Sequence, residues 1–320
     1  MALCWLLSIC FLVPRKGFTA FTVPLSMKLF RRPAPAGGAL RSQPIETGTV
    51  EWMRELNDAL ATSEETGRPV FALFQEVPGC AGCKQFGKDV LSNPFVVEAI
   101  EREFVPLLIH NNSGGRDAEV LSAYGEPAWN YQVVRFLNSA GDDIIARRDR
   151  VWETGPLLAR MVATLEVAGR EVPDYLRLLE QEHSEYLDEA FLAQGCFWVG
   201  EMEIGQIDGV VTTEAGFMHG HEVTRVLYDH RVINLEGLYE KAARRNVASA
   251  IFADSDELRR LTGRTTTNTP GRYRKAPASD QKRQLGRMTG DYTESQLTKL
   301  NAFSRTRRGD TDRFLFPSQR

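Results

Sequence analysis

The 320-residue sequence predicts two domains that mix helices and strands, an α/β domain followed by an α+β domain. Three observations support this fold class. The chain is longer than one hydrophobic core usually organises. Its first half alternates apolar, strand-like runs with helical periodicity. Its second half shows the order β-α-β-β-α-β, which is the split βαβ or ferredoxin-like arrangement.

The composition is that of an ordinary soluble globular protein, with 42% hydrophobic and 25% charged residues. The net charge of -3 is close to zero, so no overall field selects a polyanionic partner or a membrane surface. We therefore expect no nucleic-acid partner and, after processing, no membrane association.

The first 45 residues differ from the rest and are expected to be a targeting presequence. Residues 2–13 are apolar and too short to span a bilayer, which is typical of a signal-peptide core. A basic stretch without acidic residues follows, up to Glu46. This combination resembles the two-part presequence of algae with secondary plastids, and Phe21 suits the start of the transit peptide. The expected location is the plastid, with the mitochondrion and the secretory pathway as alternatives.

The first domain is expected over residues 46–170. Apolar periodicity predicts helices at 47–66, 94–103 and 156–169, and a further helix from Cys83 to about Lys88 or Val90. Continuous apolar runs predict strands at 69–74 and 105–109, and a turn between two short runs predicts a hairpin at 133–137 and 144–147. Asn93 is the expected N-cap of the helix that begins at Pro94.

Cys80 and Cys83 form a C-x-x-C motif between a predicted strand and a predicted helix. A cysteine at a helix N-terminus faces free N–H groups that favour its thiolate. Cys80 is therefore the expected attacking thiol and Cys83 the resolving one. This order of elements resembles a thioredoxin-like domain, and the resemblance implies a cis-proline facing the dithiol, for which Pro127 is the candidate.

Half a zinc site and a structural disulfide are the alternatives for the same motif. A second C-x-x-C or H-x-x-H pair is absent from the sequence, and His110 is the only histidine in the first domain. We therefore expect no bound metal.

A linker helix is expected over residues 171–188, with Tyr175, Leu176 and Leu179 on its apolar side. The second domain is expected over residues 189–258. Its predicted strands are 190–194, 210–217, 222–228 and 248–253. Its predicted helices are 199–206 and 235–245, the latter capped by Asn234.

The string Gly195-Cys196-Phe197-Trp198 resembles the signature of A-type peptide methionine sulfoxide reductases. Glu201 falls where that family has a glutamate after the signature. Glu222 begins a segment that matches the strand carrying the family's catalytic glutamate. Residues 209–211 and 249–252 match further family segments in the right order.

The resemblance implies reduction of methionine S-sulfoxide, a protein-repair activity under oxidative stress. Cys196 would attack the sulfoxide sulfur, and Glu222 would protonate the departing oxygen. Phe197 and Trp198 would enclose the substrate's methyl group. Cys196 would become a sulfenic acid that another thiol must reduce, so a thiol reductant and no other cofactor is expected.

No cysteine follows Cys196, although many family members have resolving cysteines there. Once the presequence is removed, Cys80 and Cys83 are the only other thiols. We therefore expect the C-x-x-C to be a built-in reductant, with oxidised methionine in peptides or proteins as substrate. An external thioredoxin or thioredoxin reductase system would re-reduce the dithiol.

The sequence departs from the family at two loops. Residues 218–221 replace a long segment that carries a tyrosine, and residues 244–247 replace a loop with an aspartate and a second tyrosine. Either His219 or His221 replaces the missing tyrosines as a hydrogen-bond donor to the sulfoxide oxygen, or both are ordinary solvated loop residues. The alternative function is therefore a thioredoxin-like disulfide-exchange or partner-binding protein with a degenerate second domain. A non-enzymatic scaffold is a third possibility.

Residues 259–320 form a basic, polar C-terminal extension with one expected helix at 293–303. Aromatic residues are sparse there, so a solvated or domain-wrapping extension is favoured over nucleic-acid binding.

Overall fold

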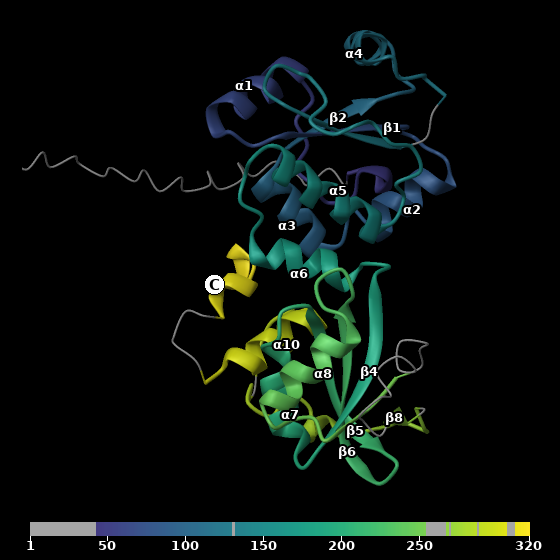
Figure 1. Cartoon of the computed structure of the whole chain (residues 1–320). Helices are drawn as coiled ribbons and strands as arrows, with labels where there is room; N and C mark the ends of the chain where they lie inside the picture. Colours follow the sequence, from purple (N-terminus) through teal and green to yellow (C-terminus); the bar gives the residue numbers. More distant parts are fainter. Residues whose placement is uncertain (1–42, 130–131, 254–266, 269, 287, 306–310) are drawn as a thin grey trace, which may run out of the picture. The chain divides into compact units, whose positions relative to one another are not determined.

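The computed structural model describes residues 43–129, 132–253, 267–268, 270–286, 288–305 and 311–320 (Figure 1). Almost all of the expected presequence lies outside the described residues. Among the described helices, none has both the length and the apolar character needed to cross a bilayer.

A three-stranded sheet organises the first part of the chain. Strand β1 (Val70–Gln75) is central, parallel to β2 (Val105–His110) and antiparallel to β3 (Val133–Leu137). The helices are α1 (Leu56–Thr66), α2 (Ala81–Asp89), α3 (Pro94–Glu103), α4 (Arg116–Tyr124) and α5 (Thr154–Val167). These elements confirm the predicted α/β domain.

Strand β1 is buried along its whole length, as its continuous apolar run predicted. Phe71 and Leu73 face one apolar cluster, and Ala72 and Phe74 face another on the opposite side. Asn93 caps α3 as predicted, because its side chain accepts hydrogen bonds from the N–H groups of Phe95 and Val96.

Two secondary-structure predictions in this domain are wrong in part. Helix α1 starts at Leu56 rather than residue 47, because Met53 lies extended and bridges to Leu107 of β2. The short 3₁₀ helix η1 (Ile45–Thr47) precedes it. Residues 144–147 form no strand. The predicted hairpin is reduced to a turn that is closed by a single bridge between Leu137 and Asp143. Helix α4 was not predicted.

Helix α6 (Asp174–Glu182) follows, within the range expected for the linker helix. The expected apolar side is buried, with Tyr175, Leu176 and Leu179 each at most 3% exposed. The Tyr175 ring packs on Phe316 with a centroid distance of 4.4 Å, so the C-terminal residues pack on this helix.

A second sheet organises the rest of the chain in the strand order β8-β7-β4-β6-β5-β9. Its strands are β4 (Leu187–Gln194), β5 (Val210–Met218), β6 (His221–Asp229), β7 (Ala250–Phe252), β8 (Thr267–Asn268) and β9 (Arg274–Lys275). Helices α7 (Phe197–Gly205) and α8 (Leu235–Arg244) complete the predicted β-α-β-β-α-β order. The four middle strands are antiparallel neighbours, which confirms the ferredoxin-like arrangement.

One face of this sheet carries the helices. Leu192 of β4 and Val226 of β6 share an apolar cluster with Ile204 of α7 and Leu238 of α8. Figure 1 shows α7 and α8 together with α10 (Glu294–Phe303) beside these strands. Phe191 and Val223, whose side chains alternate with Leu192 and Val226, belong to a different cluster on the opposite face.

Helix α10 confirms the helix predicted at 293–303 and packs on α7. Lys299 is buried, and its ammonium donates to the carbonyl of Gly205 at 2.8 Å. Burial lowers the pKa of Lys299 to about 8, while the nearby charge of Asp208 acts in the opposite direction. The lysine thereby provides a hydrogen-bond donor for a free backbone carbonyl at the C-terminal end of α7. Three 3₁₀ turns complete the segment: η2 (Ala278–Asp280), η3 (Asp312–Phe314) and η4 (Pro317–Gln319).

Candidate functional site

The structure brings the predicted site residues together in two groups, one beside each sheet. In the first group Cys80 is the N-cap residue of α2 and is half-buried, while Cys83 is buried in the first turn. Their sulfur atoms are 3.6 Å apart and are not joined in a disulfide. This is the arrangement of a reduced dithiol that can close to a disulfide.

Burial, followed by the hydrogen bond from Cys80, raises the pKa of Cys83 to about 11. Cys83 therefore stays protonated at neutral pH. The half-buried Cys80 is the sulfur that a partner can reach, which fits the predicted division between attacking and resolving thiols.

Buried polar side chains hold the turn before the dithiol. The Gln75 amide donates to the carbonyl of Glu46 at 2.7 Å and to that of Cys83 at 3.3 Å. The Glu46 carboxylate accepts from the N–H of Gly79 at 2.9 Å. The end of β1 and the η1 turn thus fix the position from which α2 begins.

The expectation for Pro127 is wrong. Among the described residues the cis peptide bond is Val77–Pro78, and Glu126–Pro127 is not cis. Pro127 lies too early in the chain, because β3 begins only at Val133. The residue that faces the dithiol is Gln132, directly before β3, whose side-chain oxygen lies 3.7 Å from the sulfur of Cys83.

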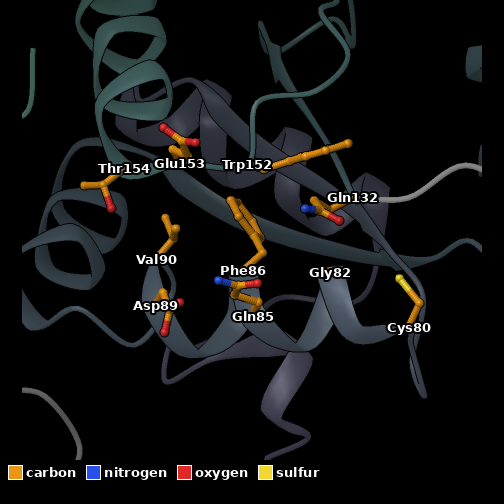
Figure 2. A pocket seen from close by; sticks show the side chains of 10 residues that line it. All are labelled: Cys80, Gly82, Gln85, Phe86, Asp89, Val90, Gln132, Trp152, Glu153 and Thr154. Atoms are coloured by element: carbon orange, nitrogen blue, oxygen red, sulfur yellow. The ribbon is translucent and has the colours of Figure 1, made fainter. Parts of the chain in front are cut away.

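A groove of about 520 Å³ opens beside Cys80. Figure 2 shows Cys80 at one end of it, Gln132 and Trp152 along it, and Asp89 and Thr154 toward the other end. Its lining mixes apolar and polar side chains, as ligand-binding clefts do. Sequence reasoning did not single out Trp152, because its position depends on how the chain returns between β3 and α5.

Glu76, Cys80 and Cys83 bring three possible metal-ligand atoms within 4.8 Å of one another. Two thiolates and a carboxylate suit a borderline-soft divalent ion. Among the described residues no fourth His, Cys, Asp or Glu joins the group, so it falls short of a closed tetrahedral site.

In the second group Cys196 is the N-cap residue of α7 and Glu222 lies near the start of β6. Gln194 of β4 pairs directly with Glu222, so the chain enters α7 next to this glutamate. The Glu222 carboxylate accepts a hydrogen bond from the N–H of Phe197 at 2.9 Å. The predicted thiol and the predicted acid are thus held at the same helix N-terminus.

Aromatic rings surround this helix start. The Phe197 ring is buried and lies 6.0 Å from Trp198 and 5.4 Å from Phe217, between centroids. Trp198 is 37% exposed. The predicted Phe-Trp pair therefore combines one core residue with one accessible ring, and β5 adds Phe217, which sequence reasoning missed.

Glu201 is fully buried one turn beyond Cys196, on α7. Burial raises its pKa to about 7, although the positive charge of Lys282 opposes the shift. Its carboxylate accepts from the backbone N–H of Lys282 at 2.7 Å. Glu201 thus anchors the C-terminal segment to α7.

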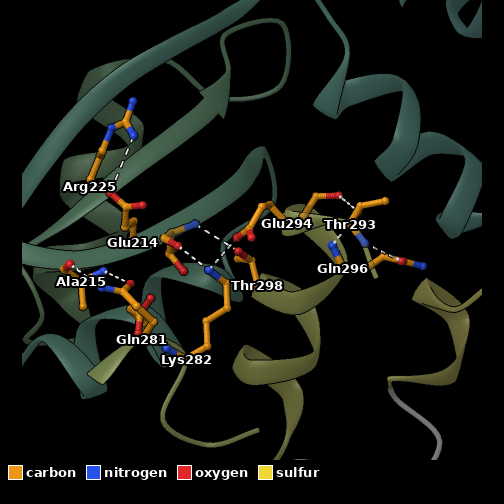
Figure 3. Close-up of polar contacts among 12 residues, drawn as sticks. Glu214, Ala215, Arg225, Gln281, Lys282, Thr293, Glu294, Gln296 and Thr298 are labelled. Atoms are coloured by element: carbon orange, nitrogen blue, oxygen red, sulfur yellow. Dashed lines mark hydrogen bonds and ion pairs between the residues drawn. The ribbon is translucent and has the colours of Figure 1, made fainter. Parts of the chain in front are cut away.

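Gln281 and Lys282 attach the same segment to β5 (Figure 3). The Gln281 amide donates to the carbonyl of Ala215 and accepts from its N–H, both at 2.9 Å. The Lys282 ammonium donates to the carbonyl of Thr213 at 3.0 Å. The basic extension therefore forms part of the wall around the second group, which its composition alone did not indicate.

The loop histidines do not share the face of the sheet that carries Glu222. His219 and Gly220 form the tight turn between β5 and β6, both with positive φ. The His219 ring packs on Phe252, which belongs to the cluster on the face opposite Glu222. His221 is exposed at the start of β6.

Comparisons with known proteins identify both parts. Residues 51–138 match a family model described as thioredoxin-like, and residues 188–241 match that of peptide methionine sulfoxide reductase. A solved structure described as "DsbH Oxidoreductase" is similar over 41% of this chain and 94% of its own, with 14% identity and a TM-score of 0.31. No curated protein matches the chain significantly. The chain therefore carries a thioredoxin-like domain followed by a peptide methionine sulfoxide reductase domain.

Proposed function

We propose that this protein reduces methionine S-sulfoxide with Cys196 as nucleophile and Glu222 as acid. The observation that carries the proposal is the Glu222 carboxylate bound to the N–H of Phe197, the residue after Cys196. The family match over residues 188–241 supports the substrate class. The A-type assignment and the S-epimer rest on the signature around Cys196.

The reaction balances as a two-electron transfer between sulfur atoms. The Cys196 thiolate attacks the sulfoxide sulfur and forms an S–S bond, while the S–O bond breaks and the oxygen leaves as water with one proton from Glu222 and one from solvent. A water molecule then attacks the Cys196 sulfur, which breaks the S–S bond and returns a proton to solvent. The products are a thioether and a sulfenic acid on Cys196. The N-terminal N–H groups of α7 stabilise negative charge on the attacking sulfur.

The C-x-x-C would return Cys196 to its reduced form. Cys80 attacks the sulfenic acid, a proton and the hydroxyl leave as water, and a Cys80–Cys196 disulfide forms. Cys83 then attacks Cys80 and releases the Cys196 thiolate, leaving a Cys80–Cys83 disulfide for an external thiol reductant. The 3.6 Å separation of the two sulfur atoms and the reachable position of Cys80 support this order.

The activity is tested with S- and R-epimers of a methionine sulfoxide peptide and dithiothreitol as reductant. We expect turnover of the S-epimer by the full chain and none by Cys196→Ser. Turnover of neither epimer by a folded full chain would contradict the proposal and favour a disulfide-exchange protein with an inactive second domain.

The relay is tested separately with Cys83→Ser, which leaves Cys80 unable to be released. After one exposure to substrate we expect a Cys80–Cys196 crosslink in the peptide map. The Cys80→Ser variant is the control and should show no such crosslink. If dithiothreitol supports turnover while no crosslink forms, the reductase proposal stands and the built-in relay is wrong.

A further inference from the structure

Two arginines from beyond the reductase-family match lie on the aromatic rings beside Cys196. The Arg274 guanidinium is 4.3 Å from the centroid of Phe217, and that of Arg283 is 5.2 Å from the centroid of Trp198. The family match ends at residue 241, so both cations belong to the C-terminal segment.

The sheet register places Arg274 on the same face as Glu222. Gln194 pairs with Glu222, Glu222 pairs with Phe217, and Phe217 pairs with Arg274. Directly paired residues project to the same side of a sheet. Arg274 therefore ends a row of side chains that begins beside Cys196 and crosses four strands.

No described carboxylate forms an ion pair with either arginine. Arg283 donates to the carbonyl of Ser279 at 3.2 Å, and no described residue accepts a hydrogen bond from Arg274. Arg225, on the opposite face, differs in this respect because Glu189 and Glu214 flank it. Both Arg274 and Arg283 are exposed, so their remaining N–H groups are open to a ligand.

A guanidinium that lies over an aromatic ring, with N–H groups left open to solvent, can bind a carboxylate through two hydrogen bonds. We propose that Arg274 and Arg283 form a carboxylate-binding site beside Cys196, which selects methionine sulfoxide that carries a neighbouring carboxylate. This inference rests on the proposed function. The carboxylate is either the α-carboxylate of the oxidised methionine or the side chain of an adjacent acidic residue.

The test compares S-epimers of N-acetyl-methionine sulfoxide, its carboxamide, and the carboxamide of N-acetyl-methionine sulfoxide-aspartate, with the full chain and dithiothreitol. We expect kcat/KM for the free acid to exceed that for the carboxamide about tenfold, the effect of one charge-assisted contact. The aspartate compound distinguishes the two sources, because it matches the free acid only if a side-chain carboxylate reaches the site.

The variants Arg274→Gln and Arg283→Gln should lower turnover of the acid and leave that of the carboxamide unchanged. Lys275→Gln is the matched control, because it removes the same charge from the next residue of β9, where the side chain bonds to Glu214 on the other face. A wild-type protein that does not distinguish acid from carboxamide would overturn the inference, as would arginine variants that lose both activities equally.

Binding to the inactive Cys196→Ser protein, measured by calorimetry, separates this inference from the proposed function. If the wild type reduces no sulfoxide but the Cys196→Ser protein binds the acid more tightly than the carboxamide in an Arg274-dependent way, the carboxylate site stands without the activity. If the wild type is active but the Cys196→Ser protein binds the acid and the carboxamide equally well, only the proposed arginine site is wrong.

Discussion

Glu222 is the residue on which the proposed reaction depends for its acid. One of its oxygens is bound to the first N–H of α7, and its strand partner Gln194 leads into Cys196. A side chain bound in this way cannot rotate freely. Its position relative to the helix N-terminus is therefore fixed by the backbone rather than by the substrate.

The substitution Glu222→Gln tests the acid. The amide oxygen can still accept from Phe197, but the amide cannot deliver a proton to the departing oxygen. We expect kcat/KM for the sulfoxide to fall roughly 10²–10⁴-fold with dithiothreitol as reductant. Alkylation of Cys196 at an unchanged rate would show that the helix start is intact, and near-normal turnover would exclude Glu222 as the proton donor.

Glu201 makes stability depend on pH. Its pKa is raised from 4.5 to about 7 in the folded protein, so the folded state binds its proton more tightly than the unfolded state does. The contribution of Glu201 to the free energy of unfolding therefore falls by up to about 3 kcal/mol as pH rises from about 4.5 to about 7. Above pH 7 this contribution no longer changes.

The variant Glu201→Gln removes this ionisation and keeps an acceptor for Lys282. We expect urea unfolding to show a stability gain over the wild type that is larger at pH 8 than at pH 5. Glu240→Gln, at an exposed position of α8, should show no such change. An equal difference at both pH values would contradict the raised pKa.

At the scale of elements, helix α7 depends on a close approach to the sheet. A β-carbon at Gly200 would meet the end of the Gln194 side-chain amide at 2.5 Å and the Thr224 hydroxyl at 2.6 Å. These two side chains are buried and bonded to each other at 2.7 Å, so neither can move away cheaply. The absence of a side chain at position 200 lets α7 lie where the N–H of Phe197 reaches Glu222.

The substitution Gly200→Ala should push α7 away from β4 and β6. We expect a loss of about 1–3 kcal/mol in the free energy of unfolding, together with slower sulfoxide reduction. Gly114→Ala is a suitable control, because a β-carbon there meets no atom within 4 Å. Unchanged activity in a folded Gly200→Ala protein would show that the helix tolerates displacement.

For the molecule as a whole, the last residues secure the C-terminal segment. Phe316 is 1% exposed and packs on Tyr175 at 4.4 Å and Phe95 at 5.3 Å between ring centroids. The N–H of Ser318 donates to Glu98 at 2.8 Å. The tail therefore contributes to the cluster that contains α3 and α6.

Phe316→Ala should cost about 3 kcal/mol of stability, since it empties a buried aromatic position. Urea unfolding measures the loss, and limited proteolysis should show earlier cleavage near the C-terminus. Ile45→Ala, at a side chain that is 49% exposed, serves as the control. A stability loss no larger than that of the control would mean that the tail does not contribute to the folded core.

The sequence predicted those elements whose causes are local. The apolar run of β1, the Asn93 and Asn234 caps and the helix start at Cys196 all depend on residues within a few positions of one another. The contact between Glu222 and the start of α7 followed from a resemblance rather than from periodicity, because strand pairing joins residues distant in the chain.

Sequence alone determined the two domains, the dithiol and the late cysteine at its helix start, because apolar periodicity, capping and C-x-x-C spacing act over short distances. Tertiary structure decided that Gln132 rather than Pro127 faces the dithiol, and that residues 274–283 complete the second group. A two-residue strand such as β9 has no periodicity of its own. It forms because the edge of β5 offers unpaired backbone groups, and that edge exists only in the folded sheet.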